Sequence, residues 1–132
     1  QLASWVEHIL ESHKVTNVYL EDYSYGSKGK VFEIGENTGV LKYVLWKSSF
    51  ADVTLHLVSP TAVKKFATGK GSSDKWGMME AFEKKTGYNI HNEITPDKET
   101  GTSPSSDIVD SFWILKYGEH DALSRNKPSD KE

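Results

Sequence analysis

The sequence contains no cysteine, which excludes disulfide bonds and thiolate-bound zinc and gives no sign of the redox compartment. It has no apolar run that approaches the length of a membrane span, and no signal-peptide pattern is visible. It also lacks an excess of positive charge. The net charge of -3 excludes a uniformly basic nucleic-acid binder but is compatible with a local basic surface. We therefore expect a cytoplasmic protein that makes no contact with membranes.

The composition fits one globular domain with a modest core. The chain has 132 residues, of which 36% are hydrophobic, and four tryptophans that can contribute to a core. Charged residues make up 27%, which is ordinary for a water-soluble domain. The sequence begins with Gln1 rather than methionine, so we expect that the protein was processed or that the sequence starts inside a longer chain.

Hydrophobic spacing divides the chain into alternating helices and strands. Helices are predicted for residues 2–13, 31–50, 61–67 and 74–85, and from Ser105 or Ser106 to about Tyr117. Strands are predicted for residues 15–22 and 52–60, a loop for residues 88–104, and a polar tail at the end of the chain. The alternation indicates an α/β fold with parallel strands. Because two strands cannot form a stable sheet covered by helices, further strands are expected before Gln1.

Small residues refine the helix predictions. Ser59 before Pro60 is typical of a helix start, and Ser72 or Ser73 is expected to cap the helix over 74–85. In the helix over 31–50, two glycines each cost about 1 kcal/mol relative to alanine, which predicts close packing there. The glycines are Gly35 and Gly39, and the broad buried face expected for this helix comprises Ile34, Val40, Leu41, Val44 and Leu45.

Three acidic residues stand at the ends of predicted elements. Glu21 ends the first strand, and Asp107 and Asp110 lie three residues apart in the first turn of the last predicted helix, on one face of it. Two carboxylates this close repel each other unless a cation lies between them, and carboxylate oxygens suit magnesium. The alternative is that both aspartates simply favour the positive end of the helix dipole.

Lysines gather around the turn TGKGSSDK. A glycine-rich turn that leads into a helix exposes backbone N–H groups that suit a phosphate, and the lysines Lys64, Lys65, Lys70 and Lys75 would neutralise a nucleic-acid backbone. The spacing of a Walker A loop is absent. The alternative is a solvated helix face followed by an ordinary turn.

The segment YSYGSKGK, residues 23–30, is rich in glycine and serine and is predicted to be a loop. Lys28 and Lys30 are further candidates for DNA contacts, and the aromatic residues Tyr23, Tyr25 and Phe32 could stack on bases or anchor the loop to the core. The five histidines show no spacing typical of a zinc site.

The segment VSPTAVKKFATGKGSSDKWGMMEAF, residues 58–82, resembles the RuvC family of Holliday junction resolvases. The matching positions are Pro60, Val63, Lys64, Lys65, Gly69, Gly71, Asp74 and Lys75. The resemblance extends upstream to VYLE, which ends in Glu21, and to IGENTGVLKYVL, and downstream to SDIVDS with Asp107, Asp110 and Ser111. It covers residues 2–117, and the order and spacing of the four motifs are its most specific feature.

The resemblance implies an RNase H-like domain over residues 1–118, a mixed sheet flanked by helices, followed by a polar tail over 119–132. In the family an antiparallel meander precedes this region and carries the first catalytic Asp, so both are expected before Gln1. The resemblance further implies cleavage of branched DNA, such as four-way junctions, by a homodimer that uses Mg²⁺, with Mn²⁺ as a substitute.

Site residues follow from the same resemblance. Glu21, Asp107 and Asp110 are expected to be metal ligands and catalytic residues, and Lys75 is expected to position a phosphate or the attacking water. DNA contacts are expected from Lys64, Lys65, Lys70, Lys28 and Lys30. Two alternatives stay open: a nuclease-inactive RNase H-like module that binds nucleic acid, and an RNase H-like nuclease that acts on flaps or RNA–DNA hybrids.

Overall fold

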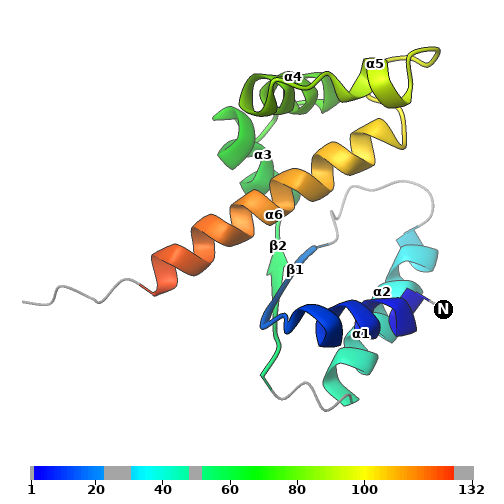
Figure 1. Cartoon of the computed structure of the whole chain (residues 1–132), viewed down its shortest axis with the longest axis vertical. Coiled ribbons are helices and arrows are strands. Elements are labelled where there is room, and N and C mark those ends of the chain that lie inside the picture. Colours follow the sequence, from blue (N-terminus) through cyan, green and yellow to red (C-terminus); the bar gives the residue numbers. More distant parts are fainter. Residues whose placement is uncertain (1, 23–30, 48–51, 127–132) are drawn as a thin grey trace, which may run out of the picture. The chain divides into compact units, whose positions relative to one another are not determined.

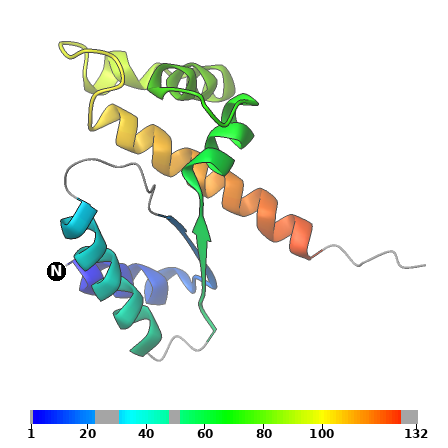
Figure 2. The ribbon, with the colours of Figure 1, turned by 180° about the vertical axis from the view of Figure 1, so that it is seen from behind.

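The computed structural model describes residues 2–22, 31–47 and 52–126 (Figures 1 and 2). The chain divides into two compact units, Gln1–Leu57 and Val58–Glu132, and each is described here by itself. No helix among the described residues is long and apolar enough to cross a membrane.

The first unit combines two helices with a small parallel sheet. Its elements are α1 (Leu2–His13), β1 (Asn17–Glu21), α2 (Val31–Lys47) and β2 (Thr54–Val58), whose last residue opens the second unit. β1 and β2 are hydrogen-bonded neighbours in the described part of the chain, and Thr54 N donates to Thr16 O (2.8 Å) just before the strands pair. The expected α/β character and parallel pairing are confirmed, although both strands are shorter than predicted.

The packing of α1 against α2 buries fewer side chains than the sequence predicts. Leu10 and Leu45 are buried, but Ile34 and Val40 are 54% and 57% exposed, so the broad buried face expected for α2 is wrong in part. The explanation offered for Gly35 and Gly39 is also wrong, because no described atom lies within 4 Å of a Cβ built at either glycine.

The second unit is helical. It contains α3 (Pro60–Thr68), α4 (Lys75–Thr86), α5 (Ile90–Ile94) and α6 (Ser105–Arg125). α6 is the long helix of this unit, and α3, α4 and α5 all pack against it, as both views show (Figures 1 and 2). The core forms where they meet: Trp113 Nε1 donates to the carbonyl oxygen of Met78 (3.3 Å), and Phe82 and Phe112 pack edge to face.

The helix ends are set by single side chains. Ser59 Oγ accepts a hydrogen bond from Ala62 N (3.1 Å) with Pro60 in the first helical position, which confirms the predicted start of α3. Asp74, rather than Ser72 or Ser73, caps α4, because its Oδ1 accepts from Gly77 N (2.9 Å). Aspartate and serine are equally good caps, and Asp74 is the one that directly precedes the first residue of α4.

Two predictions after residue 87 are wrong. Part of the expected loop forms α5, which Asn89 caps by accepting a hydrogen bond from Asn92 N (2.9 Å). Neither Ser105 nor Ser106 caps α6, since both lie inside the helix and are 0% and 2% exposed. Ser105 Oγ instead shares a hydrogen bond with Thr95 Oγ1 (2.6 Å), whereas the buried Ser106 hydroxyl has no partner within the described residues.

α6 also continues past Tyr117 to Arg125, so residues 119–125, expected in a polar tail, are helical. Ion pairs support this polar stretch: Lys116 Nζ lies 2.8 Å from Glu119 Oε2, and Arg125 Nε lies 2.8 Å from Asp121 Oδ2. Pairs three or four residues apart stabilise a helix that lacks a continuous apolar stripe.

We predict that Gly39→Ala raises the free energy of unfolding by about 1 kcal/mol, because alanine favours the helix and meets no described atom there. Urea denaturation followed by circular dichroism measures the change.

Gly69→Ala is the matched control. A Cβ at Gly69 also meets no described atom, but its φ of 80° is left-handed, so alanine should lower the free energy of unfolding by about 1–2 kcal/mol. A loss of stability in Gly39→Ala would show that this face of α2 is covered.

Candidate functional site

The two aspartates of the candidate site lie on one face of α6, one turn apart. Asp107 is exposed in the first turn, whereas Asp110 is half-buried in the second turn, which corrects the expectation that both lie in the first. Between them Val109 faces the core and is among the most buried side chains of the chain. The packing that buries Val109 therefore holds Asp110 at the edge of the core.

Asp107 is held by a residue that the sequence did not single out. Ser103 Oγ donates a hydrogen bond to Asp107 Oδ2, from a position two residues before the helix begins. The spacing of serine and aspartate four residues apart across a helix start was the available signal, since a hydroxyl there can reach the first turn. The bond restricts the rotation of the Asp107 carboxylate.

Asp110 lies in an electrostatic environment set by three other site residues. Burial raises the pKa of the Asp110 carboxyl, Lys75 opposes this increase, the Asp107 charge adds to it, and Lys64 opposes it. The structure thus brings together Lys64 of α3, Lys75 of α4, and Asp107 and Asp110 of α6, four of the predicted site residues. Opposite charges close to a carboxylate favour its ionised form, and burial disfavours it.

Lys75 is placed by the loop that leads into α6. A Cβ built on Gly101, whose φ is 86°, would lie 3.1 Å from Lys75 Cβ. Only glycine fits this conformation so close to the lysine stem. The approach of this loop keeps the first residue of α4 next to the first turns of α6.

Three backbone N–H groups of the turn before α4 are engaged in hydrogen bonds within the second unit. Gly69 N donates to Lys65 O (2.9 Å), Lys70 N to Thr68 Oγ1 (3.2 Å) and Ser73 N to Lys70 O (3.2 Å). The Asp74 carboxylate also occupies the start of α4 and would repel an anion. The side chains of Lys65 and Lys70 are exposed beside this turn.

For the remaining predicted site residues, the structure gives no position relative to the two aspartates. Glu21 is the exposed last residue of β1 in the first unit, and its place relative to Asp107 and Asp110 stays a prediction. Lys28, Lys30, Tyr23 and Tyr25 lie outside the described residues, and Phe32 is 88% exposed in the first turn of α2.

The aspartate pair fits a hard divalent cation. Its donors are carboxylate oxygens, and the two negative charges sit together at the edge of a core, where a cation would relieve their repulsion. Within the described part of the second unit, no group of three or more His, Asp or Glu side chains comes together as a metal site. Asp107 and Asp110 would thus supply two of the ligands of an ion that otherwise binds water or further acids.

Comparisons with known proteins give a similarity in structure but none in sequence. Neither models of protein families nor curated protein sequences match the chain. Among solved structures, the RuvC structure of Thermus thermophilus is similar, with a TM-score of 0.55 and 15% sequence identity. The similarity covers 88% of this chain, which spans 66% of the Thermus protein. At this identity it concerns the fold alone, and it confirms the expected likeness to the RuvC fold.

We predict that Asp110→Asn raises the free energy of unfolding of the metal-free protein at neutral pH, because it removes a charge that burial and Asp107 disfavour. The increase should be less than about 1 kcal/mol, since water screens a half-buried group. Because its pKa is raised in the folded chain, folded Asp110 holds a proton more strongly than unfolded Asp110. Its contribution to stability is therefore favourable at low pH and is lost as pH rises through the folded pKa.

The increase in the free energy of unfolding caused by Asp110→Asn should therefore disappear near pH 3, where the Asp110 carboxyl of the parent protein is protonated. Urea denaturation with a chelator present measures the free energy of unfolding at pH 7 and at pH 3. Asp97→Asn, at an exposed position between α5 and α6, is the control and should change neither. Destabilisation by Asp110→Asn at pH 7 would contradict the electrostatic description of the site.

Proposed function

We propose that this chain belongs to a structure-specific DNA endonuclease that hydrolyses phosphodiester bonds in branched DNA such as four-way junctions. The observation that carries the proposal is the meeting of Asp107 and Asp110 with Lys64 and Lys75 on one surface of the second unit. Paired carboxylates beside lysines can hold a divalent cation and a phosphate at the same time. The RuvC-like fold supports the same reading.

In this proposal Asp107, Asp110 and Glu21 hold Mg²⁺, with Mn²⁺ as a substitute. When bound, the metal supplies an activated water and stabilises the charge that develops on the phosphate. Ser103 keeps the Asp107 carboxylate oriented, and the half-buried position of Asp110 keeps its oxygens fixed. Lys75, which acts electrostatically on Asp110, would position the scissile phosphate or the water.

The lysines would follow the DNA backbone outward from the site. Lys64 is half-buried beside Asp110, whereas Lys65 and Lys70 are exposed and can reach neighbouring phosphates. Lys28 and Lys30 are proposed as further contacts. Each contact between a lysine and a phosphate releases a bound counterion, so affinity should fall steeply with salt.

A homodimer is part of the proposal. α2 carries the apolar side chains of Phe32, Val40, Tyr43 and Trp46, which are all more than half exposed. Large apolar side chains gathered on one helix favour burial against a partner. A second copy of the chain is the partner that a junction with paired arms would require.

Cleavage of a synthetic four-way junction by the full-length protein tests the proposed reaction. Asp110→Asn and Asp107→Asn should abolish cleavage while leaving junction binding in place, because they remove metal ligands and no lysine. Asp97→Asn should cleave at the parental rate. Cleavage by Asp110→Asn at the parental rate would overturn the assignment, and binding without cleavage by the parent would favour the nuclease-inactive module.

We also predict that Lys64→Gln weakens junction binding and reduces the slope of log affinity against log salt by about 1, the loss of one phosphate contact. Lys14→Gln, at the end of α1, makes the same change in net charge and should leave the slope unchanged. Equal slopes for the parent and Lys64→Gln, measured by fluorescence anisotropy at several salt concentrations, would remove Lys64 from the interface.

A further inference from the structure

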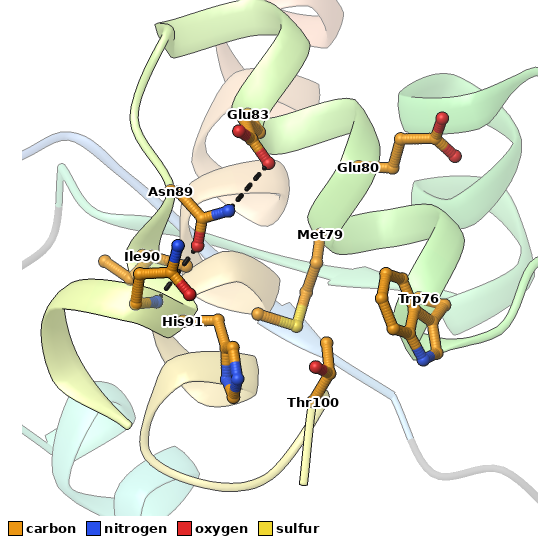
Figure 3. A pocket seen from close by; sticks show the side chains of 9 residues that line it. Trp76, Met79, Glu80, Glu83, Asn89, Ile90, His91 and Thr100 are labelled. Atoms are coloured by element: carbon orange, nitrogen blue, oxygen red, sulfur yellow. Dashed lines mark hydrogen bonds between the residues drawn. The ribbon is translucent and has the colours of Figure 1, made fainter. Parts of the chain in front are cut away.

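A second concave site lies between α4 and α5, and none of its lining residues belongs to the aspartate–lysine site. The cavity has a volume of about 570 Å³, within the range of pockets that bind small molecules or single side chains. Figure 3 shows Trp76, Met79 and Glu83 on the α4 wall, with Asn89 and His91 opposite.

Hydrogen bonds hold the walls of this pocket in place. Asn89 Nδ2 donates to Glu83 Oε2 (3.0 Å), which ties the start of α5 to α4 (Figure 3). On the other wall, His91 Nδ1 lies 3.1 Å from Thr95 Oγ1, which shares a hydrogen bond with Ser105 of α6. Because the walls are tied both to each other and to the core helix, the pocket is formed before any ligand enters.

The lining has the chemistry that a cation recognises. Met79 is 7% exposed and, with buried Ile90, forms an apolar floor, whereas the Trp76 indole is 63% exposed. Glu80 and Glu83 add two carboxylates, and no lysine or arginine lines the cavity. Two negative charges without a cation disfavour phosphate and therefore nucleic acid.

We propose that this pocket binds an arginine side chain from an exposed segment of a partner protein. The planar guanidinium can stack on the indole of Trp76 while it donates hydrogen bonds to a glutamate. The aliphatic part of the arginine covers Met79 and Ile90. Glu80 makes no hydrogen bond or ion pair among the described residues, but it also lines a neighbouring hollow with Lys70 and Lys84, so Glu83 is the main charge offered to the ligand.

Arginine fits better than lysine because three features of the site match it. A flat guanidinium uses an exposed aromatic face, an apolar floor and a carboxylate together, whereas an ammonium group is a compact charge that keeps its water. The inference is independent of the proposed nuclease activity.

An acetylated Gly-Arg-Gly amide is the probe, and its citrulline analogue is the neutral control of equal shape. The indole N–H signal of Trp76 in a ¹H–¹⁵N correlation spectrum, assigned with Trp76→Phe, should shift and saturate with the arginine peptide only. Glu83→Gln keeps an oxygen that accepts from Asn89 but removes the charge, and it should weaken binding about fivefold. Glu80→Gln should also weaken binding.

Glu11→Gln on α1 makes the same change in net charge outside the pocket and should bind like the parent. The proposal is overturned if the Trp76 signal stays unchanged, responds equally to the citrulline peptide, or is affected equally by Glu11→Gln and Glu83→Gln. It is also overturned if the Trp76 signal shifts with protein concentration alone, because a second copy of the chain would then occupy the pocket. A shift on addition of junction DNA would overturn it as well.

Discussion

The packing of α6 against the other helices of the second unit is the interaction on which the candidate site depends. Ser105, Val109 and Trp113 recur every four residues and are all buried, so they fix the rotation of the helix about its axis. Once that rotation is fixed, Asp107 points away from the core and Asp110 lies at its edge. The geometry of the carboxylate pair is therefore a consequence of core packing.

The same packing makes the site electrostatically costly. A carboxylate at the edge of a core, one turn from another, has its pKa raised by burial and by its neighbour. Lys75 and Lys64 offset part of that cost from two other helices. Folded proteins place such destabilising groups mainly where they serve binding or catalysis. The conflict between burial and charge at Asp110 is thus a stronger functional signal than the spacing of the two aspartates.

Sequence reasoning succeeded where a single local signal determines the structure. The 3.6-residue apolar stripe of α1 gives both ends of that helix, and Ser59–Pro60 gives the start of α3.

Sequence reasoning failed where contacts between residues distant in the sequence determine the structure. Ser105 was expected to cap α6, but Thr95 draws its hydroxyl into the core. Gly35 and Gly39 were expected to pack closely, but among the described residues nothing beyond the helix's own backbone lies within 4 Å of a Cβ built at either position. The grouping of Lys64 and Lys75 with the aspartates depends on how three helices pack, which no motif encodes.

α4 takes part in two surfaces of different chemistry. Its first residue, Lys75, acts on Asp110, whereas Trp76 and Glu83 line the pocket shared with α5. Residues 75 and 76 differ by 100° around the helix, so neighbours in sequence serve different surfaces. A net charge of -3 therefore describes neither surface, because Lys75 acts on Asp110 whereas Glu83 lines the pocket. One helix thus places a positive charge near Asp110 and a negative charge in the pocket.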